Sequence, residues 1–417
     1  MNVETFIRSI MSKISVKGKL YEDFFVHIVT LFLSLRGKYN FLNMARYGTK
    51  VESTYRTRFQ KPHNIEDFNL ELIKQYFSED VIWAFDPSYL SKSGKKSHGV
   101  GKFWSGCVGA MKWGQEIGCI AAIGLRQRTA LHYKAIQTPA KPEEKTLLDY
   151  YANVLISEKE TLQSVSSTIA MDAYFSKKPF IDSLTEHNFT VISRFRKDVF
   201  LQYIYVGPQK GGKGKNIGGG KGSGGGAPKK YDGKVNLKDL NPQYFTPCFQ
   251  DKDEDEIGYE AVVYSKALQR IVRVVVVYKL RPDGSIKSAF VYLSTDLKIP
   301  GMYVLLYYRL RFQQEFIFRD AKQHVGLQNC QARSKEQLDY HVNMSMTTVN
   351  VAKAMYHLNE DNLEKPFSMA DIKTQYFNEL MIGEVLDVFI EVSGIDPNLM
   401  LNNPRILELT NKGKIAA

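Results

Sequence analysis

Hydrophobic and polar positions repeat with different periods along the chain, and the changes of period predict an α/β protein. Apolar residues recur at helical spacing over 21–35 and 68–77, so we expect residues 1–80 to form a helical N-terminal region. Short continuous apolar runs at 81–85 and 168–171 are typical of buried strands, and an aspartate follows each run directly. The pattern therefore predicts buried strands whose ends carry acidic side chains.

The rest of the chain divides into strand and helix patterns. Strand patterns cover 99–110, 117–125, 189–193, 200–206, 258–264, 270–279 and 286–294. Helix patterns cover 143–165, 308–322, 334–358 and 363–417. We expect residues 81–200 and 296–360 to form one core, with residues 201–295 as a β-rich insertion within it. A helical C-terminal region over 361–417, a candidate dimerisation region, completes the predicted domain order.

Composition and charge indicate a protein with a large core and a polyanionic partner. The chain has 417 residues, of which 44% are hydrophobic and 24% charged, as in ordinary globular proteins. Its net charge of +12 favours nucleic acid or an anionic membrane surface. The most apolar early run, 24–35, is too short to span a bilayer, so we expect it to form a core helix. The four cysteines form no Cys-x2-Cys pair, which favours a reducing cytoplasm over a zinc site or a secreted disulfide framework.

Two segments are strongly basic. Residues 36–61 carry one acid, Glu52, among interleaved aromatic residues, and their basic residues are Arg36, Lys38, Arg46, Lys50, Arg56, Arg58 and Lys61. This mixture fits DNA phosphate contacts, and it fits a solvated basic surface over core aromatics equally well. Residues 207–230 are rich in Gly and Lys and contain no acid, as in a flexible loop that contacts a DNA backbone or only links its neighbours. Gly214 stands where a phosphate-binding loop needs Ser or Thr, so we exclude that motif.

Two aspartates are candidate site residues. Asp86 follows the run 81–85 and precedes Pro87, which we expect to end the strand. Asp172 follows the run 168–171 at a junction between a strand and a helix. Each has a simpler interpretation, since Asp before Pro is a common turn former and Asp before a helix is a common N-cap.

The segment 308–322 places charge on a face that should be buried. On a helix, Tyr308, Arg311, Glu315 and Lys322 fall within a stripe about 60° wide that two phenylalanines flank. Burying such charges without partners costs several kcal/mol, so they need compensation. An i,i+4 ion pair between Arg311 and Glu315 on a solvated helix would supply part of it.

The spacing Tyr-x2-Arg-x3-Glu-x6-Lys of this segment resembles the Tyr-Arg-Glu-Lys (YREK) signature of bacterial insertion-sequence transposases of the DDE class. The stretch 86–106 is similar to the first-Asp block of the same family. The resemblance implies a ribonuclease-H-like catalytic core with a β insertion before the Glu. It also implies that Asp86, Asp172 and Glu315 are the catalytic acids and bind Mg²⁺ or Mn²⁺, two ions in each active site. Three carboxylates supply the hard oxygen ligands that these ions prefer.

In that family the Tyr, Arg and Lys of the signature hold DNA phosphates beside the Glu. Basic residues near the two aspartates and in the N-terminal region are further candidates for DNA contact. The DNA-binding residues that we expect are Tyr308, Arg311, Lys322, Arg194, Arg196, Lys92, Lys95, Arg46, Lys50, Arg56 and Arg58.

The resemblance implies cut-and-paste DNA transposition by two-metal phosphoryl transfer, through nicking, hairpin formation, hairpin opening and strand transfer, with no nucleophilic side chain. The expected partners are double-stranded DNA, as terminal inverted repeats and as target, and a second copy of the chain in a homodimeric synaptic complex. We expect a cytoplasmic, nucleoid-associated protein without a membrane partner. Two alternatives stay open: a metal-dependent DNA nuclease on the same core, and a catalytically silent, transposase-derived DNA-binding protein.

Overall fold

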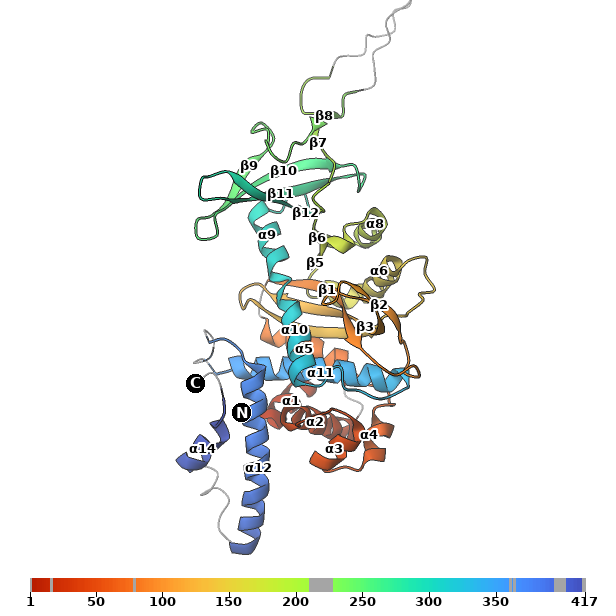
Figure 1. Ribbon diagram of the computed structural model, residues 1–417, viewed down its shortest axis with the longest axis vertical. Helices are drawn as coiled ribbons and strands as arrows, with labels where there is room; N and C mark the ends of the chain where they lie inside the picture. Colours follow the sequence, from red (N-terminus) through yellow and green to blue (C-terminus); the bar gives the residue numbers. More distant parts are fainter. Residues whose placement is uncertain are drawn as a thin grey trace, which may run out of the picture. The chain divides into compact units, whose positions relative to one another are not determined.

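The computed structural model describes residues 2–15, 18–77, 80–209, 228–359, 362, 365–393 and 403–414. The chain forms two compact units. The first unit combines Met1–Glu143 with Phe312–Ala417, and the second unit is Glu144–Arg311. Both units contain strands and helices, as the α/β prediction requires, and helices lie at both ends of the chain (Figure 1). Most of the Gly- and Lys-rich segment 207–230 lies outside the described residues.

Four strands form the sheet of the first unit. They are β1 (Val81–Ser91), β2 (Gly101–Ser105), β3 (Ala110–Gly124) and β4 (Thr129–Gln137). All their pairings are antiparallel, and β3 is central because it pairs with each of the other three strands. The first half of β1 and most of β3 from Gly114 onward are buried, so the core of the unit lies against this part of the sheet.

The strand boundaries differ from those expected from the sequence. β1 continues through Pro87 to Ser91 in register with β3, so the expectation that the strand ends at Asp86 is wrong. An antiparallel strand turns only alternate N–H groups toward a given neighbour, and proline is tolerated where its missing N–H is not needed. The predicted strands 99–110 and 117–125 are also wrong in extent, because β2 is short and β3 begins at Ala110.

The helices of the first unit come from both ends of the chain. They are α1 (Val3–Met11), α2 (Lys19–Ser34), α3 (Phe41–Tyr47), α4 (Glu52–Arg58), α5 (Ile65–Tyr76), α10 (Gln313–His324), α11 (Lys335–His357), α12 (Met369–Ser393) and α14 (Pro404–Asn411). Figure 1 shows α11 running between the sheet and the helices α1 to α4, and it contacts β4, α2 and α5. Within the described part of the chain, no helix is long and apolar enough to cross a membrane.

The helix α11 is buried on nearly all sides, so the predicted amphipathic pattern of 334–358 is wrong although its extent is nearly right. Two of its asparagines bond the backbone of β4. Asn343 accepts from the N–H of Ala135 at 2.9 Å and donates to its carbonyl at 3.1 Å. Asn350 bonds the N–H and the carbonyl of His132 in the same way. These bonds allow a polar helix to lie in the core, because buried polar groups are costly only when they are unpaired.

The second unit carries a larger sheet. Its elements are α6 (Leu147–Ser157), α7 (Lys159–Gln163), β5 (Thr168–Ala170), the 3₁₀ turn η1 (Ala173–Phe175), α8 (Lys178–Glu186), β6 (Thr190–Arg194), β7 (Leu201–Ile204), β8 (Tyr231–Lys234), β9 (Thr246–Asp251), β10 (Glu256–Ser265), β11 (Arg270–Leu280), β12 (Ile286–Ser294) and α9 (Gly301–Leu310). The strand order is β5-β6-β12-β11-β10-β7-β8, with β9 paired to β10. β5 and β6 are parallel and the other pairs are antiparallel.

The predicted strands in 200–206 and 258–294 are confirmed in outline. The single helix expected over 143–165 is wrong, because Glu158 leaves the helical conformation with φ −97° and ψ 4° and separates α6 from α7. The two aspartates identified from the sequence therefore belong to different units, with Asp86 on β1 and Asp172 two residues after the end of β5.

Candidate active site

In the first unit, Asp86 lies beside the lysine of the signature segment. Asp86 is half-buried in the middle of β1, opposite Cys119 of β3. Lys322 of α10 donates from Nζ to the hydroxyl of Ser88 at 2.8 Å and to the carbonyl of Tyr89 at 3.0 Å. Burial lowers the pKa of Lys322, and the negative charge of Asp86 opposes that shift. The lysine therefore lies within electrostatic reach of Asp86.

The helical turn that carries the glutamate of the signature segment is hydrogen-bonded to the same part of this sheet. Gln314, in the first turn of α10, is fully buried and donates from Nε2 to the carbonyl of Cys119 at 2.6 Å. Cys119 is the residue that pairs with Asp86 across the ladder. The helical turn that carries Glu315 is therefore fixed one strand away from Asp86, and Glu315 itself is half-buried.

In the second unit, Asp172 lies among the aromatic and basic residues of α9 and β6. Its carboxylate accepts from the N–H of Tyr174, so it caps η1, as the simpler interpretation of the sequence predicts. The guanidinium groups of Arg194 and Arg311 lie 5.9 Å and 5.7 Å from the centre of the Tyr308 ring. Burial raises the pKa of Tyr308, the two arginines oppose that shift and Asp172 adds to it. Asp172, Arg194, Tyr308 and Arg311 consequently form one charged cluster.

The signature segment is not one helix. α9 ends at Leu310 and α10 begins at Gln313, so the prediction of a single helix with one charged stripe over 308–322 is wrong. Both intervening residues keep right-handed helical dihedrals, but the N–H of Glu315 bonds the carbonyl of Phe312 and so closes a tighter turn. The segment contains neither Gly nor Pro, the usual causes of a break, and the break coincides with the boundary between the units.

The basic residues expected to contact DNA have different environments. Lys92 donates to the carbonyls of Gln328 and Cys330 at 3.0 Å and 2.9 Å, and burial lowers its pKa. It therefore has a structural role that the sequence did not indicate, whereas Lys95 on the same loop is exposed. Arg196 is exposed and lines a pocket of about 790 Å³ in the second unit together with Arg194, Lys197, Lys238 and Lys287.

In the basic segment of the N-terminal region, buried aromatic residues lie among basic residues that are exposed or half-buried. Most of its aromatic residues are buried, as the interpretation of core aromatics under a basic surface predicts; these are Tyr39, Phe41, Tyr55 and Phe59. Arg56 pairs with Glu52 and lies over the ring of Phe41, and Arg58 lies over the ring of Phe24. Arg46 is exposed and Lys50 is half-buried. A DNA-binding role for these residues stays a prediction.

Hard oxygen donors for Mg²⁺ or Mn²⁺ are present in both units, Asp86 and Glu315 in the first and Asp172 in the second. Among the described residues, no group of three or more His, Cys, Asp or Glu side chains is arranged to hold a metal ion. The donor chemistry therefore fits such ions, while the coordinates of the described residues do not form a complete ligand set.

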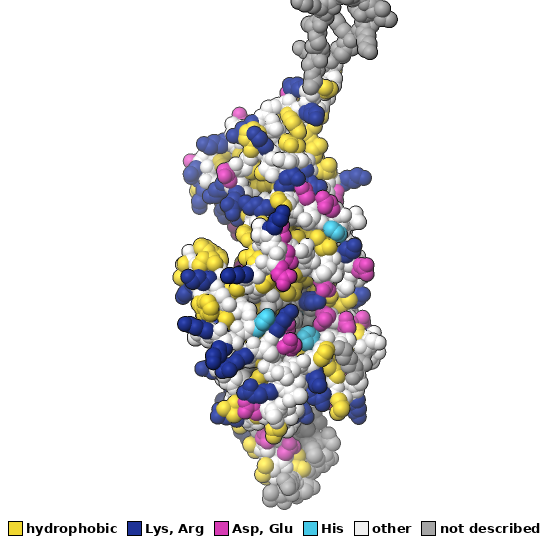
Figure 2. Space-filling model, turned by 90° about the vertical axis from the view of Figure 1, so that its right-hand side faces the viewer, with side chains coloured by type: hydrophobic (Ala, Val, Ile, Leu, Met, Phe, Trp, Pro, Cys, Tyr) yellow, Lys and Arg dark blue, Asp and Glu magenta, His cyan; other side chains and the backbone are white. Residues whose placement is uncertain are grey.

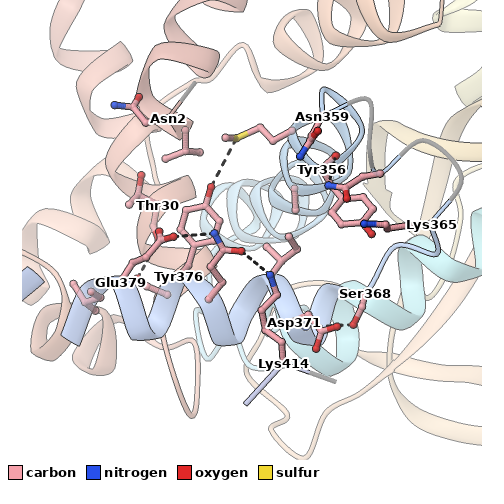
Figure 3. Close-up of a pocket in the computed structure, with 18 of the residues that line it drawn as sticks. Asn2, Thr30, Tyr356, Asn359, Lys365, Ser368, Asp371, Tyr376, Glu379 and Lys414 are labelled. Carbon is pink, nitrogen blue, oxygen red and sulfur yellow. Dashed lines mark hydrogen bonds between the residues drawn. The ribbon is translucent and has the colours of Figure 1, made fainter. Parts of the chain in front are cut away.

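A separate pocket of about 980 Å³ lies in the first unit, between α2, the end of α11 and α12 (Figure 3). Its polar lining includes Asp371, Glu379 and Lys414, and Lys414 donates to Gln375 at 3.0 Å. None of the site residues expected from the sequence lines it.

Two residues near Asp86 were not predicted from the sequence. They are Gln314 and Ser88, and the only indication in the sequence was their closeness along the chain to Glu315 and to Asp86.

Figure 2 shows lysine and arginine side chains spread over one face of the molecule, between smaller groups of acidic and hydrophobic side chains. This distribution agrees with the net charge of +12 and with a polyanionic partner.

Comparison with known families supplies an independent result. Residues 91–351 match the family model described as transposase DDE domain. No curated protein matches the chain in sequence. The matched region includes Asp172, Glu315 and the whole signature segment, and it begins five residues after Asp86 (91−86=5). Since this match covers more than half of the chain, the protein belongs to the family of transposases with a DDE domain.

Proposed function

We propose that the protein is a Mg²⁺- or Mn²⁺-dependent DNA transposase of the YREK subclass, with a ribonuclease-H-like core, that moves its element by cut and paste. The observation that carries this proposal is the distribution of the signature residues. Lys322 lies beside Asp86 in the first unit, and Tyr308 and Arg311 lie beside Asp172 in the second. Each aspartate therefore has cations in place for the phosphates of a DNA strand.

In this proposal Asp86, Asp172 and Glu315 would hold two divalent ions, and such ions would supply activation of a water or 3′-hydroxyl and stabilisation of the leaving oxygen. Lys322, whose Nζ is fixed by Ser88 and Tyr89, offers its charge to a phosphate near Asp86. Arg194 and Arg311, held on the Tyr308 ring, bind a phosphate near Asp172. These cations orient the strand and offset its charge, and the protein acts on paired DNA ends as a homodimer.

Two further roles compete with transposition. A nuclease on the same core would cut the DNA without joining it, and a silent DNA-binding protein would do neither. Incubating the protein with Mg²⁺ and a labelled duplex that carries the element end separates the three. Hairpin and strand-transfer products support the transposase, simple cleavage supports the nuclease, and binding without products supports the silent protein.

The variant Glu315→Gln tests the site directly. We expect it to lose metal-dependent cleavage and to keep DNA binding, because the amide has nearly the size of the carboxylate but no charge for a cation. Glu336→Gln is the matched control, since Glu336 is exposed in the first turn of α11 and has no assigned role. Cleavage by Glu315→Gln at the rate of the control would contradict the proposal.

A further inference from the structure

The hairpin of β2 and β3 exposes large apolar side chains on one face. Trp104, Met111 and Trp113 have exposed fractions of 58%, 57% and 41%. Trp104 pairs with Met111 and Lys102 pairs with Trp113 in the ladder. Alternate residues of a strand point to the same side, so Lys102, Trp104, Met111 and Trp113 share one side of the hairpin. We call these four residues the hairpin face.

The hairpin face is not explained by packing within the first unit. Phe103, which points to the opposite side of β2, is buried with an exposed fraction of 3%. The hairpin thus places one aromatic residue in the core and leaves two tryptophans outside it. Exposed aromatic clusters of this kind mark interaction sites more often than chance.

A basic cleft adjoins the hairpin in the first unit. It encloses about 560 Å³ and is lined by the loop 91–97, by residues 328–331, and by Lys38 and Arg333. Its charged lining residues are all basic; they are Lys38, Lys92, Lys95, Lys96 and Arg333. Lys92 is committed to two backbone carbonyls, while Lys38, Lys95, Lys96 and Arg333 are exposed. A cleft whose charged residues are all cations attracts a polyanion.

Two hydrogen bonds and one electrostatic interaction connect the hairpin face, the basic cleft and the part of β1 that carries Asp86. The indole of Trp113 donates to the carbonyl of Gly94, in the loop that lines the cleft, at 3.2 Å. The hydroxyl of Tyr89, on β1, donates to the carbonyl of Trp113. At the turn of the hairpin, Cys107 lies close enough to Lys322 to affect its pKa. The three features therefore lie side by side on the first unit.

We propose that the hairpin face and the basic cleft together bind an unpaired DNA strand, with bases stacked on Trp104 and Trp113 and phosphates in the cleft. Aromatic platforms next to cationic grooves are the recurring composition of single-strand sites, because every base offers a face for stacking once it leaves the duplex. A duplex keeps its base faces stacked on one another and cannot use the tryptophans in this way. The inference rests on the proposed function, since strand cleavage near Asp86 would supply the unpaired strand.

Binding to labelled oligothymidylate of about twenty nucleotides, without metal, tests the inference by fluorescence anisotropy. We expect Trp104→Leu to weaken single-strand binding about tenfold or more, because leucine keeps the apolar area but loses the stacking surface. Trp104→Phe should bind within about threefold of the parent, since it keeps an aromatic face. Binding of a duplex of the same length should change little in either variant.

The cleft is tested through the salt dependence of the same binding. The triple variant Lys95→Gln, Lys96→Gln, Arg333→Gln should lower the slope of log affinity against log salt by about two, because each lost single-strand phosphate contact removes about 0.7. The control carries the same loss of charge at exposed residues of the first unit outside the cleft, as Lys74→Gln, Arg126→Gln, Arg128→Gln. It should keep the slope of the parent.

Intrinsic fluorescence gives a second readout. The chain has three tryptophans, and Trp83 is fully buried. Oligothymidylate should quench the parent, and it should leave the double variant Trp104→Phe, Trp113→Phe unquenched.

The inference is overturned if Trp104→Leu binds oligothymidylate as tightly as Trp104→Phe, or if the triple variant keeps the salt slope of its control. These assays use no metal and no cleavage. If the parent cleaves the element-end duplex in the separate Mg²⁺ assay but Trp104→Leu binds oligothymidylate as tightly as Trp104→Phe, only this inference is removed. A parent that shows Trp104-dependent binding but no cleavage removes the proposed transposase activity instead.

Discussion

The two regions that carry the aspartates are built in different ways. Asp86 lies within a long strand, and the nearby lysine is fixed by two hydrogen bonds to that strand. Asp172 lies after a strand of three residues and caps a 3₁₀ turn, and the cations near it rest on an aromatic ring. The first region is held by regular backbone pairing, and the second by side-chain packing.

This difference shows what the signature segment does in the fold. Its first half, with Tyr308 and Arg311, belongs to the second unit, and its second half, with Glu315 and Lys322, belongs to the first. A spacing that is regular in sequence therefore serves two separate environments. Each half supplies cations to a different aspartate, so the two regions should respond differently to substitution.

The largest effect is expected at the aspartates. Asp86→Asn and Asp172→Asn should each reduce cleavage on the order of a thousandfold, because in the proposed mechanism each removes a negative charge that would hold a metal ion. Asn is as good an N-cap as Asp, so Asp172→Asn should keep the stability of the second unit. Asp172→Ala should lower that stability by about 1 kcal/mol, measured by denaturant unfolding. Equal stability of the Asn and Ala variants would contradict the capping role.

The pH dependence of stability distinguishes the two units. Burial lowers the pKa of Lys353, in the core of the first unit, from 10.5 to about 8. Between these values the unfolded chain binds more protons than the folded one, so the unfolding free energy of the first unit should rise with pH. The gain in unfolding free energy across this pH range is about 3 kcal/mol. It is absent below pH 8, where Lys353 is protonated in both the folded and the unfolded state.

The variant Lys353→Met should lose this rise, measured as the difference between its unfolding free energy and that of the parent from pH 7.5 to 10.5. The second unit should show no such difference. A pH-independent difference between parent and variant would show that Lys353 keeps its ordinary pKa.

A somewhat smaller effect is expected at Lys322. Lys322→Met should reduce cleavage about a hundredfold, because it removes a fixed cation from the phosphate near Asp86. Lys335→Met, on the exposed first turn of α11, is the matched control and should cleave normally. Comparable rates for the two variants would exclude a role for Lys322 in phosphate binding.

The smallest effect is expected at the tyrosine. Tyr308→Phe should change DNA affinity little, because phenylalanine keeps the ring beneath Arg194 and Arg311. Tyr308→Leu should weaken DNA binding by about 1 kcal/mol, since both arginines lose their aromatic support. Equal affinities of the two variants in anisotropy titrations would indicate that the arginines do not depend on the ring.

The sequence predicted the α/β class, the strand that carries Asp86 and the strand that precedes Asp172, because these depend on local apolar runs, which strand burial requires. It could not predict the break after Leu310, since no Gly or Pro marks it and the break coincides with the boundary between the two units, which no local pattern reveals. It missed β4 and misjudged α11 for one shared reason. His132, Asn343 and Asn350 look like surface residues, but they satisfy one another in the core.

Replacing each acid by cysteine tests most directly whether Asp86, Asp172 and Glu315 bind the same divalent ions. Thiolate is a softer ligand than carboxylate and disfavours Mg²⁺ more strongly than Mn²⁺. We predict that Asp86→Cys, Asp172→Cys and Glu315→Cys each lose cleavage of an element-end duplex in Mg²⁺ and regain part of it in Mn²⁺. A variant that cleaves as well as the parent in Mg²⁺ would show that its residue is not a metal ligand, and the account of a shared site would fail.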